Sequence, residues 1–390
     1  MISPSSRFTK EWTSSLSGGS DYLLPPISGG KRADDEDLVA ELGASGYALA
    51  RTKDDLSSAN ADRVWGLFAA QDLAYELDRE RFAPGQPSLA QMTAYAIERL
   101  AGKEQSRHHG FFLFVEGSKV DFAAHANDPV GVVSELLAFD AAVERSLAYA
   151  RSNDHTQVIV VADHGTGGLS VGTNADRNYS RTDDDSVVVP LRKAKVTASR
   201  LAQLLLEGGE DSPTKILERE WGIDDLSGDE RQQLEQALRS RQGLNTQLSR
   251  IISTRARIGW TTDNHTGADV YLFAYGPERP QGLVENTDVG KAIATFLDLS
   301  LDEMQPRLFT DLTAALEDSG YAIALDPKGP KGGRLIVHRG KHTAEMPFSK
   351  NHLVIDGGRI ELEGLVVYSE HLGRVFGPRQ ILDVLRRAMP

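Results

Sequence analysis

Three short stretches of this 390-residue chain combine histidine with carboxylate side chains at spacings that suit metal binding. Asp121 and His125 lie four residues apart in an expected loop, Asp163 is followed directly by His164, and His265 lies in a third polar stretch. The chain has ten histidines and no cysteine, so any metal must be held by imidazole and carboxylate groups. Zinc accepts both kinds of ligand, and this mixture of residues therefore suits a zinc site.

The elements expected around these residues would bring them to one edge of a sheet. Two apolar runs, at residues 111–115 and 158–162, have the length of buried strands, and a long helical pattern lies between them. Strand, helix and strand in this order predict a βαβ unit of a parallel sheet, whose ligands lie beyond the carboxyl ends of the strands. Glu116 follows the first run, and Asp163 and His164 follow the second. Each piece alone is weak, but together the pieces predict a two-metal site.

The helix between the two runs begins at Asp128 and Pro129. Its apolar residues recur at helical spacing, and we expect an inward face made of Val132, Leu136, Phe139, Val143 and Leu147. Taken with the αβ patterns nearer the N-terminus, this predicts the α/β class, with a mostly parallel sheet and helices on both faces.

Two later segments differ from this pattern. Residues 196–258 carry helical patterns, among them a capping box from Ser227 to Glu230, and predict a helical insertion. From about residue 306 the chain becomes β-rich, with a turn at Asp356-Gly357-Gly358. We therefore expect an α/β domain over residues 1–305 and a small β-rich module over residues 306–390.

Composition excludes several classes of function. The formal net charge of −13 comes without a block of Lys and Arg that could neutralise a nucleic-acid backbone, so no nucleic-acid partner is expected. No apolar run reaches the ~18 to 20 residues of a membrane-spanning helix. The first fifteen residues, MISPSSRFTKEWTSS, lack the charged and apolar regions of a secretory signal, so no signal peptide is expected in this chain.

The candidate ligands lie in three longer stretches: FFLFVEGSKVDFAAHANDPVGVVSELLAFDAAVE, VIVVADHGTGGLS and GWTTDNHTGADVYLFAYGP. These stretches resemble the corresponding parts of bacterial and animal alkaline phosphatases, in the same order and with matching separations. Weaker similarity upstream extends the resemblance over roughly residues 15–300. It implies an alkaline phosphatase-like fold and the hydrolysis of phosphate monoesters, with release of inorganic phosphate, through a phosphoserine intermediate.

The resemblance also implies roles for individual residues. Asp121, His125 and His265 would hold one Zn²⁺, Asp163 and His164 would hold a second Zn²⁺, and Glu116 would be a ligand of one Mg²⁺. One neighbouring position departs from the family, because Phe122 stands where relatives often place Lys, His or Trp near the phosphate. Phe122 either weakens phosphate binding or packs a wall of the pocket.

A larger departure concerns the nucleophile. The family's Asp-Ser-Ala-type motif, its further magnesium ligands and its phosphate-binding Arg are not found in this sequence. Ser57 lies in a loop-like stretch and Ser319 lies beyond the last family motif, so neither fits the role of the nucleophilic serine. We expect the chain to start within the fold and to show little activity by itself.

Three interpretations share this fold and differ in function. The chain is part of an ordinary alkaline phosphatase whose nucleophile is encoded upstream, or a half-enzyme completed by a separate chain, or a non-catalytic metal-binding or interaction protein descended from the enzyme. The resemblance implies a periplasmic or extracellular location and is compatible with a homodimer. The physiological phosphoester and the role of the C-terminal module stay open.

Overall fold

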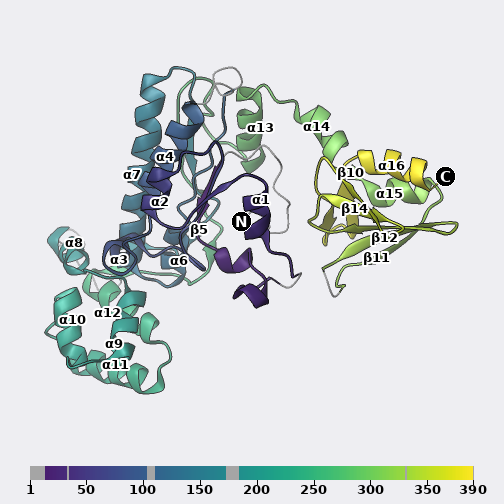
Figure 1. Cartoon of the computed structure of the whole chain (residues 1–390). Coiled ribbons are helices and arrows are strands. Elements are labelled where there is room, and N and C mark those ends of the chain that lie inside the picture. Colours follow the sequence, from purple (N-terminus) through teal and green to yellow (C-terminus); the bar gives the residue numbers. More distant parts are fainter. Residues whose placement is uncertain (1–13, 33–34, 103–109, 173–183, 330–331, 390) are drawn as a thin grey trace. The chain divides into compact units, whose positions relative to one another are not determined.

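The computed structural model describes residues 14–32, 35–102, 110–172, 184–329 and 332–389 (Figure 1). The chain divides into two compact units. The first comprises Met1–Ala50, Ala59–Gln71 and Gly282–Pro390, and the second comprises Arg51–Ser58 and Asp72–Gln281. Within the described ranges, no helix combines the length and the hydropathy that crossing a bilayer requires.

The first unit begins with a small parallel sheet. Its strand order is β1 (Ser14–Ser17), β3 (Val64–Leu67) and β2 (Ala48–Ala50). The helix α1 (Leu38–Ala44) begins at Asp37, whose carboxylate accepts a hydrogen bond from the amide of Ala40. Two 3₁₀ turns, η1 (Ser20–Tyr22) and η2 (Pro26–Ser28), complete this region. The apolar side chains between helix and sheet are Leu23, Leu38, Val39, Leu42, Tyr47, Trp65 and Leu67.

The second unit is built around two long helices that pack on each other, α4 (Leu89–Ala101) and α7 (Pro129–Ser152). Shorter helices surround them: α2 (Lys53–Ser58), α3 (Glu76–Phe82) and α6 (Lys119–His125). A capping box of Ser88 and Gln91 starts α4. Asp128 followed by Pro129 starts α7, as the sequence predicted.

The strand predicted over residues 111–115 is wrong, because none of its residues is assigned to a strand. A strand needs a neighbour that takes up its backbone N–H and C=O groups, and no described strand pairs with this segment. The second predicted strand is present as β4 (Val158–Val161), but it pairs antiparallel with β9 (Leu272–Tyr275). The expected parallel βαβ pairing is therefore not found at this point of the described chain.

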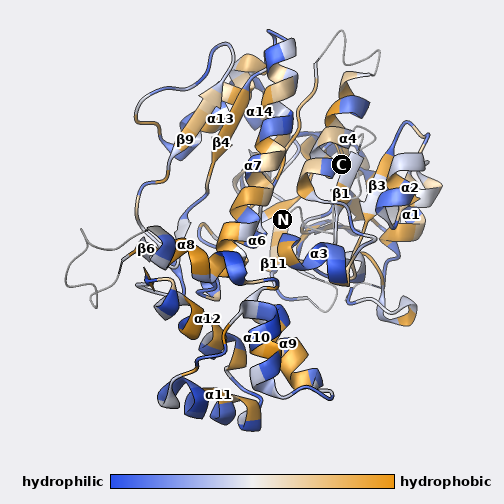
Figure 2. Cartoon of the chain, turned by 90° about the vertical axis from the view of Figure 1, so that its left-hand side faces the viewer, coloured by the Kyte–Doolittle hydropathy of each residue, from blue (hydrophilic) through white to orange (hydrophobic). Residues whose placement is uncertain are grey.

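The inward face predicted for α7 is only partly buried. Leu136 on this face is 54% exposed and its neighbour Leu137 is 64% exposed, whereas the small residues Ala142 and Ala150 are buried. Figure 2 shows hydrophobic residues along α7 and on β4 and β9. The difference arises because helical periodicity identifies an apolar stripe but does not say what covers it.

A group of helices follows β4 in the second unit: α8 (Asp184–Lys193), α9 (Ala198–Glu207), α10 (Pro213–Trp221), α11 (Gly228–Ser240) and α12 (Leu244–Arg255). Leu201, Leu217, Trp221, Leu248 and Ile252 are among their fully buried core residues. The predicted capping box of Ser227 and Glu230 is present at the start of α11. Short antiparallel pairs flank this helical group: β5 (Gly165–Thr166) with β8 (His265–Thr266), and β6 (Ser170–Val171) with β7 (Ile258–Gly259).

The C-terminal part of the first unit is β-rich, as predicted. It follows α13 (Asn286–Phe296), whose N-cap is Glu285, and α14 (Leu301–Leu308). Its antiparallel sheet has the order β11 (Ala322–Asp326), β12 (Arg334–Arg339), β13 (His342–Pro347), β14 (His352–Ile355) and β15 (Gly358–Glu361). A second sheet joins β10 (Thr310–Asp311), β17 (Arg374–Gly377) and β16 (Val367–Ser369), with the helices α15 (Leu312–Asp318) and α16 (Gln380–Ala388) packed into the same core.

The predicted turn at residues 356–358 joins β14 to β15. Asp356 and Gly357 both have positive φ angles, 49° and 86°, which two-residue hairpin turns require. Together these elements form an α/β fold with a small β-rich C-terminal part.

Candidate metal centre

The helix α6 presents Asp121 and His125 side by side. Sequence reasoning placed both in a loop, whereas the structure places them one turn apart on a helix, where residues i and i+4 lie on the same face. The buried Ala123 and Ala124 lie on the opposite side, and α6 packs against α7. Alanine has a high helix propensity, which explains why this segment forms a helix rather than a loop.

A short strand pair brings His265 to the same place. His265 lies in β8, opposite Thr166 in β5. The turn after β5 is held by the amide of Gly167, which donates to the carbonyl of Asn264 at 3.0 Å. Gly167 has a φ of +76°, and a Cβ atom there would lie 2.7 Å from the indole ring of Trp260. Only glycine fits this position without strain.

The three side chains converge. Their ligand atoms lie within 4.8 Å of one another, with 3.4 Å between His125 Nε2 and Asp121 Oδ2 and 3.2 Å between His125 Nε2 and His265 Nε2. Ligand atoms at ~2.0 Å from a tetrahedral zinc are about 3.3 Å apart, so these separations fit such an ion. His125 Nδ1 lies 2.5 Å from the carbonyl oxygen of Asp263. A carbonyl only accepts, so the proton is on Nδ1 and the Nε2 lone pair is available to a metal.

The predicted second pair lies next to this group. The ring of His164 stacks on that of His265, with 3.5 Å between ring centroids and 22° between planes. Asp163 Oδ2 is 3.2 Å from His164 Nε2, and the Asp163 side chain is 85% exposed. Glu116 is exposed. Among the described residues, it is not part of the group formed by Asp121, His125 and His265. Its role as a magnesium ligand stays a prediction.

Sequence reasoning missed two polar partners of these residues. One is the carbonyl of Asp263, and backbone groups leave no signal in a sequence. The other is Thr166, whose hydroxyl donates to Asp121 Oδ1 at 2.5 Å and lies 3.1 Å from His164 Nδ1. A signal existed, because residues two apart in an extended segment project to the same side, and Thr166 follows His164 by two.

The side chain of Phe122 is 38% exposed. The ammonium group of Lys119 lies 4.9 Å from the centroid of its ring and 4.4 Å from that of Tyr75. Lys119 also forms an ion pair with Asp72 at 3.7 Å. The phenyl ring cannot bind an anion, but a cation contacts it from the same helix.

Ser57 lies in α2, where the sequence predicted a loop, and Ser319 directly follows α15. The hydroxyl of Ser57 donates to the carbonyl of Asp54 at 2.9 Å, and the hydroxyl of Ser319 donates to that of Ala315 at 2.7 Å. Each side chain thus bonds back to its own helix, a common behaviour of serine.

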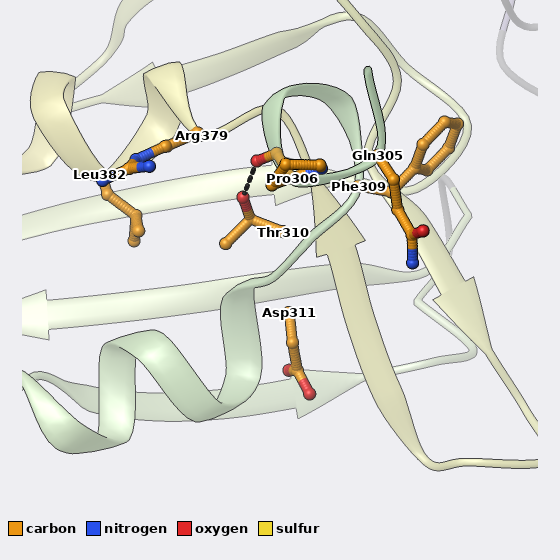
Figure 3. A pocket seen from close by; sticks show the side chains of 7 residues that line it. All are labelled: Gln305, Pro306, Phe309, Thr310, Asp311, Arg379 and Leu382. Carbon is orange, nitrogen blue, oxygen red and sulfur yellow. Dashed lines mark hydrogen bonds between the residues drawn. The ribbon is translucent and has the colours of Figure 1, made fainter. Parts of the chain in front are cut away.

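A hollow of about 460 Å³ lies elsewhere, in the first unit (Figure 3). It contains no histidine, and its one carboxylate, Asp311, is already paired with Arg374 at 2.6 Å. We therefore do not assign the chemistry to this hollow. The residues that line it are Gln305, Pro306, Phe309, Thr310, Asp311, Arg379 and Leu382.

Comparison with known proteins identifies a family. The family described as "Alkaline phosphatase" matches residues 11–299. The chain is 36% identical over 286 residues to alkaline phosphatase 4 of Bacillus subtilis, covering 72% of this chain and 57% of that protein. It is 33% identical over 307 residues to the repressible alkaline phosphatase of Saccharomyces cerevisiae, covering 70% and 53%. The chain thus spans somewhat more than half the length of these relatives.

Two solved structures are similar to the chain, each at 29% identity and a TM-score of 0.61. They are the cold-active alkaline phosphatase of Shewanella sp., with 72% of this chain and 64% of that chain covered, and the alkaline phosphatase of Thermus thermophilus, with 74% and 63% covered.

Proposed function

Because this chain belongs to the alkaline phosphatase family, we propose that it supplies the metal-binding half of an active site that hydrolyses phosphate monoesters. The observation that carries the proposal is the convergence of Asp121, His125 and His265 from α6 and β8. A carboxylate with two imidazoles leaves a bound zinc with net positive charge, which favours a phosphate dianion as ligand.

We assign the metals as follows. Asp121, His125 and His265 would hold one zinc, and their mutual separations support this assignment. Asp163 and His164 would hold the second zinc, and the 3.2 Å between Asp163 Oδ2 and His164 Nε2 supports this assignment. Glu116 would contribute to a magnesium site. When bound, such ions stabilise negative charge on phosphoryl oxygens and lower the pKa of bound water.

The chain's own residues prepare these sites. The carbonyl of Asp263 holds the His125 ring with its proton on Nδ1. Asp121 keeps Oδ2 directed at the group while Oδ1 is occupied by Thr166. We place the serine nucleophile, and so the phosphoserine intermediate, in a part of the family's fold outside these 390 residues. The hydroxyls of Ser57 and Ser319 each donate to a backbone carbonyl of their own helix, which supports this placement.

The test joins the part of Bacillus subtilis alkaline phosphatase 4 that this chain does not match to the N-terminal side of the chain. The chain alone should hydrolyse p-nitrophenyl phosphate barely above background, also when Ser57 and Ser319 are changed to Ala. The joined protein should turn the substrate over at rates ordinary for enzymes, roughly 1 s⁻¹ or more, with activity that rises with pH.

Two substitutions in the joined protein locate the site. Asp163→Ala should abolish activity, whereas His338→Ala, in β12 of the other unit, should leave it nearly unchanged. A joined protein that folds and binds zinc but hydrolyses no phosphomonoester would favour a non-catalytic role. Equal losses in the two variants would show that the site is misplaced, and full activity of the chain alone would refute the external nucleophile. Periplasmic or extracellular location, which we also propose from the family, is tested by cell fractionation.

A further inference from the structure

Thr166 occupies a central position among the predicted metal ligands. It lies in β5 and is the register partner of His265 in β8. The strand pair is continued by the hydrogen bond from the Gly167 amide to the Asn264 carbonyl at 3.0 Å and closed by one from the Thr261 amide to the Gly167 carbonyl at 3.1 Å. These backbone hydrogen bonds fix the Cα position of Thr166. Its hydroxyl can therefore contact only groups that lie close to this position.

The hydroxyl of Thr166 meets one residue from each predicted ligand set. Its oxygen lies 2.5 Å from Asp121 Oδ1 and 3.1 Å from His164 Nδ1. An ionised carboxylate can only accept, so the single hydroxyl proton goes to Asp121. The hydroxyl oxygen is then left as an acceptor, so the 3.1 Å contact is a hydrogen bond when His164 carries its proton on Nδ1.

This chain of two hydrogen bonds determines which His164 nitrogen has a free lone pair. With the proton on Nδ1, Nε2 is an acceptor, and it faces Asp163 Oδ2 at 3.2 Å. Two atoms with lone pairs at this distance attract each other only through a shared proton or metal ion. On the other side, the bond to Oδ1 leaves Asp121 Oδ2 directed at His125 Nε2 at 3.4 Å. One hydroxyl therefore orients a ligand atom in both sets.

We propose that Thr166 is a positioning residue that couples the two predicted zinc sites, by fixing the Asp121 carboxylate and the Nδ1-protonated form of the His164 ring through one hydroxyl. This inference rests on the proposed function. Partners of this kind, which orient metal ligands without touching the metal, typically change metal affinity about 10- to 100-fold when removed. A residue that only packed the loop would not change the tautomer of His164.

The experiment compares Thr166→Val, which keeps the shape and removes the hydroxyl, with Thr166→Ser, which keeps the hydroxyl. The matched control is Thr93→Val, since Thr93 is buried in α4 of the same unit and its hydroxyl donates to the carbonyl of Leu89 at 2.8 Å. Zinc affinity of the 390-residue chain is measured by competition with a chelator. The protonated nitrogen of His164 is read by NMR of the ¹⁵N-labelled ring in metal-free protein.

We expect Thr166→Val to bind zinc at least ~10-fold more weakly and to lose the pure Nδ1–H signature. Thr166→Ser should lie within a few-fold of the wild type in affinity and keep that signature, and Thr93→Val should change neither. Unchanged affinity and tautomer in Thr166→Val would overturn the inference. If Thr166→Val does not fold, Thr166→Ser is the deciding variant. Loss of the Nδ1–H signal of His164 in Thr166→Ser would also overturn the inference. A wild-type chain that binds no zinc would refute the proposed function, while the tautomer measurement would still decide the role of Thr166.

Discussion

At the scale of single residues, the two carboxylate oxygens of Asp121 have different partners. Oδ1 accepts the hydroxyl of Thr166 at 2.5 Å, and Oδ2 faces His125 Nε2 at 3.4 Å. A carboxylate fixed in this way loses little further rotamer freedom when it binds an ion, which favours tight binding. The first predicted zinc set therefore has its protein ligands in position within one chain.

We predict that the purified chain retains near one equivalent of zinc after dialysis. His125→Ala or His265→Ala should reduce the retained zinc well below this level, because each removes one of the ligands that converge on the group. His338→Ala is the control, since that ring bonds Thr343 in the C-terminal sheet. Elemental analysis measures the content. Two retained zinc ions, or one that survives both ligand substitutions, would contradict the assignment.

At the scale of elements, one carboxylate joins the metal-binding helix to the helices that follow β4. Asp128 follows α6, and its Oδ1 accepts from the amide of Val130 at the start of α7. Its Oδ2 accepts from the amide of Ala198 at the start of α9, at 2.9 Å. Asp78 binds the neighbouring Thr197 through both the amide and the hydroxyl. Two buried carboxylates thus satisfy the N-terminus of α9.

Removing Asp128 should destabilise this unit strongly. Asp128→Ala deletes the acceptor at two helix starts at once, and we expect a loss of roughly 2 to 4 kcal/mol in the free energy of unfolding. Asp140→Ala, at an exposed position of α7, should change it by less than about 0.5 kcal/mol. Urea unfolding followed by tryptophan fluorescence checks this. Equal values for the two variants would show that Asp128 does not connect the helices.

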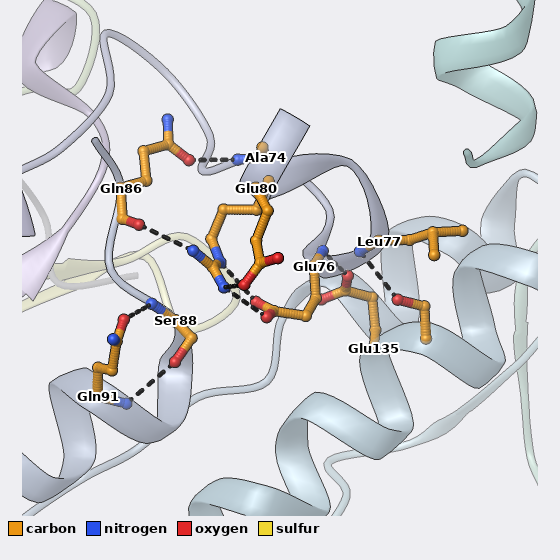
Figure 4. Close-up of polar contacts among 10 residues, drawn as sticks. Ala74, Glu76, Leu77, Glu80, Gln86, Ser88, Gln91 and Glu135 are labelled. Atoms are coloured by element: carbon orange, nitrogen blue, oxygen red, sulfur yellow. Dashed lines mark hydrogen bonds and ion pairs between the residues drawn. The ribbon is translucent and has the colours of Figure 1, made fainter. Parts of the chain in front are cut away.

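The contacts between α3 and α7 predict a dependence of stability on pH (Figure 4). The amide of Glu76 donates to Glu135 at 2.5 Å, and the amide of Leu77 donates to the hydroxyl of Ser134. Burial raises the pKa of Glu135 to about 7 and that of Asp128 to about 6. A carboxyl with a raised pKa binds protons more tightly in the folded state, so the stability it contributes is lost as pH rises through that value.

We therefore expect the free energy of unfolding to fall between about pH 5 and pH 7. The slope from Glu135 is at most about 1.4 kcal/mol per pH unit. Glu135→Gln keeps an acceptor for the Glu76 amide and removes the titration, so it should flatten the slope. Urea unfolding at several pH values tests this. Carboxylates with lowered pKa values, such as Asp225 beside Arg255, make the free energy of unfolding rise with pH instead, mainly at lower pH. A slope unchanged in Glu135→Gln would contradict the assignment.

At the scale of the whole molecule, the C-terminal module has a core of its own. Its buried side chains all come from residues 312–389, and Leu335, Val337 and Met346 are almost fully buried. We propose that residues 306–390 fold by themselves. A fragment of these residues should show a β-type circular dichroism spectrum and a cooperative thermal transition, and Val337→Asp should abolish both, because a buried unpaired charge is costly. A fragment without a cooperative transition would contradict this.

The second unit exposes several large apolar side chains. Phe114 is 72% exposed, Tyr271 84% and Phe273 65%. We propose that further protein covers these side chains, because large exposed apolar groups favour contact with other protein. We expect the 390-residue chain to bind the dye ANS, and the joined protein described above to bind much less, because added residues cover the surface. The double variant Phe112→Ser, Phe114→Ser should reduce dye binding by the chain alone. Equal fluorescence of chain and joined protein would contradict this expectation.

The sequence by itself determined the family, the α/β class, the β-rich end and the residue types of the candidate metal site. It also located helix starts such as Asp128 and Ser227 and the hairpin turn at Asp356. These features depend on caps, turns and periodicities among residues close together in the chain, so the sequence pattern predicts them.

Tertiary structure alone decided which of these residues meet. The hydrogen bond between Thr166 and Asp121 spans 45 residues, and the contact between His125 and His265 spans 140. Whether the apolar run at 111–115 forms a strand likewise depends on a partner that supplies its backbone hydrogen bonds. Such contacts are set by how separate elements pack, and no local periodicity specifies the distance between two side chains so far apart in the chain.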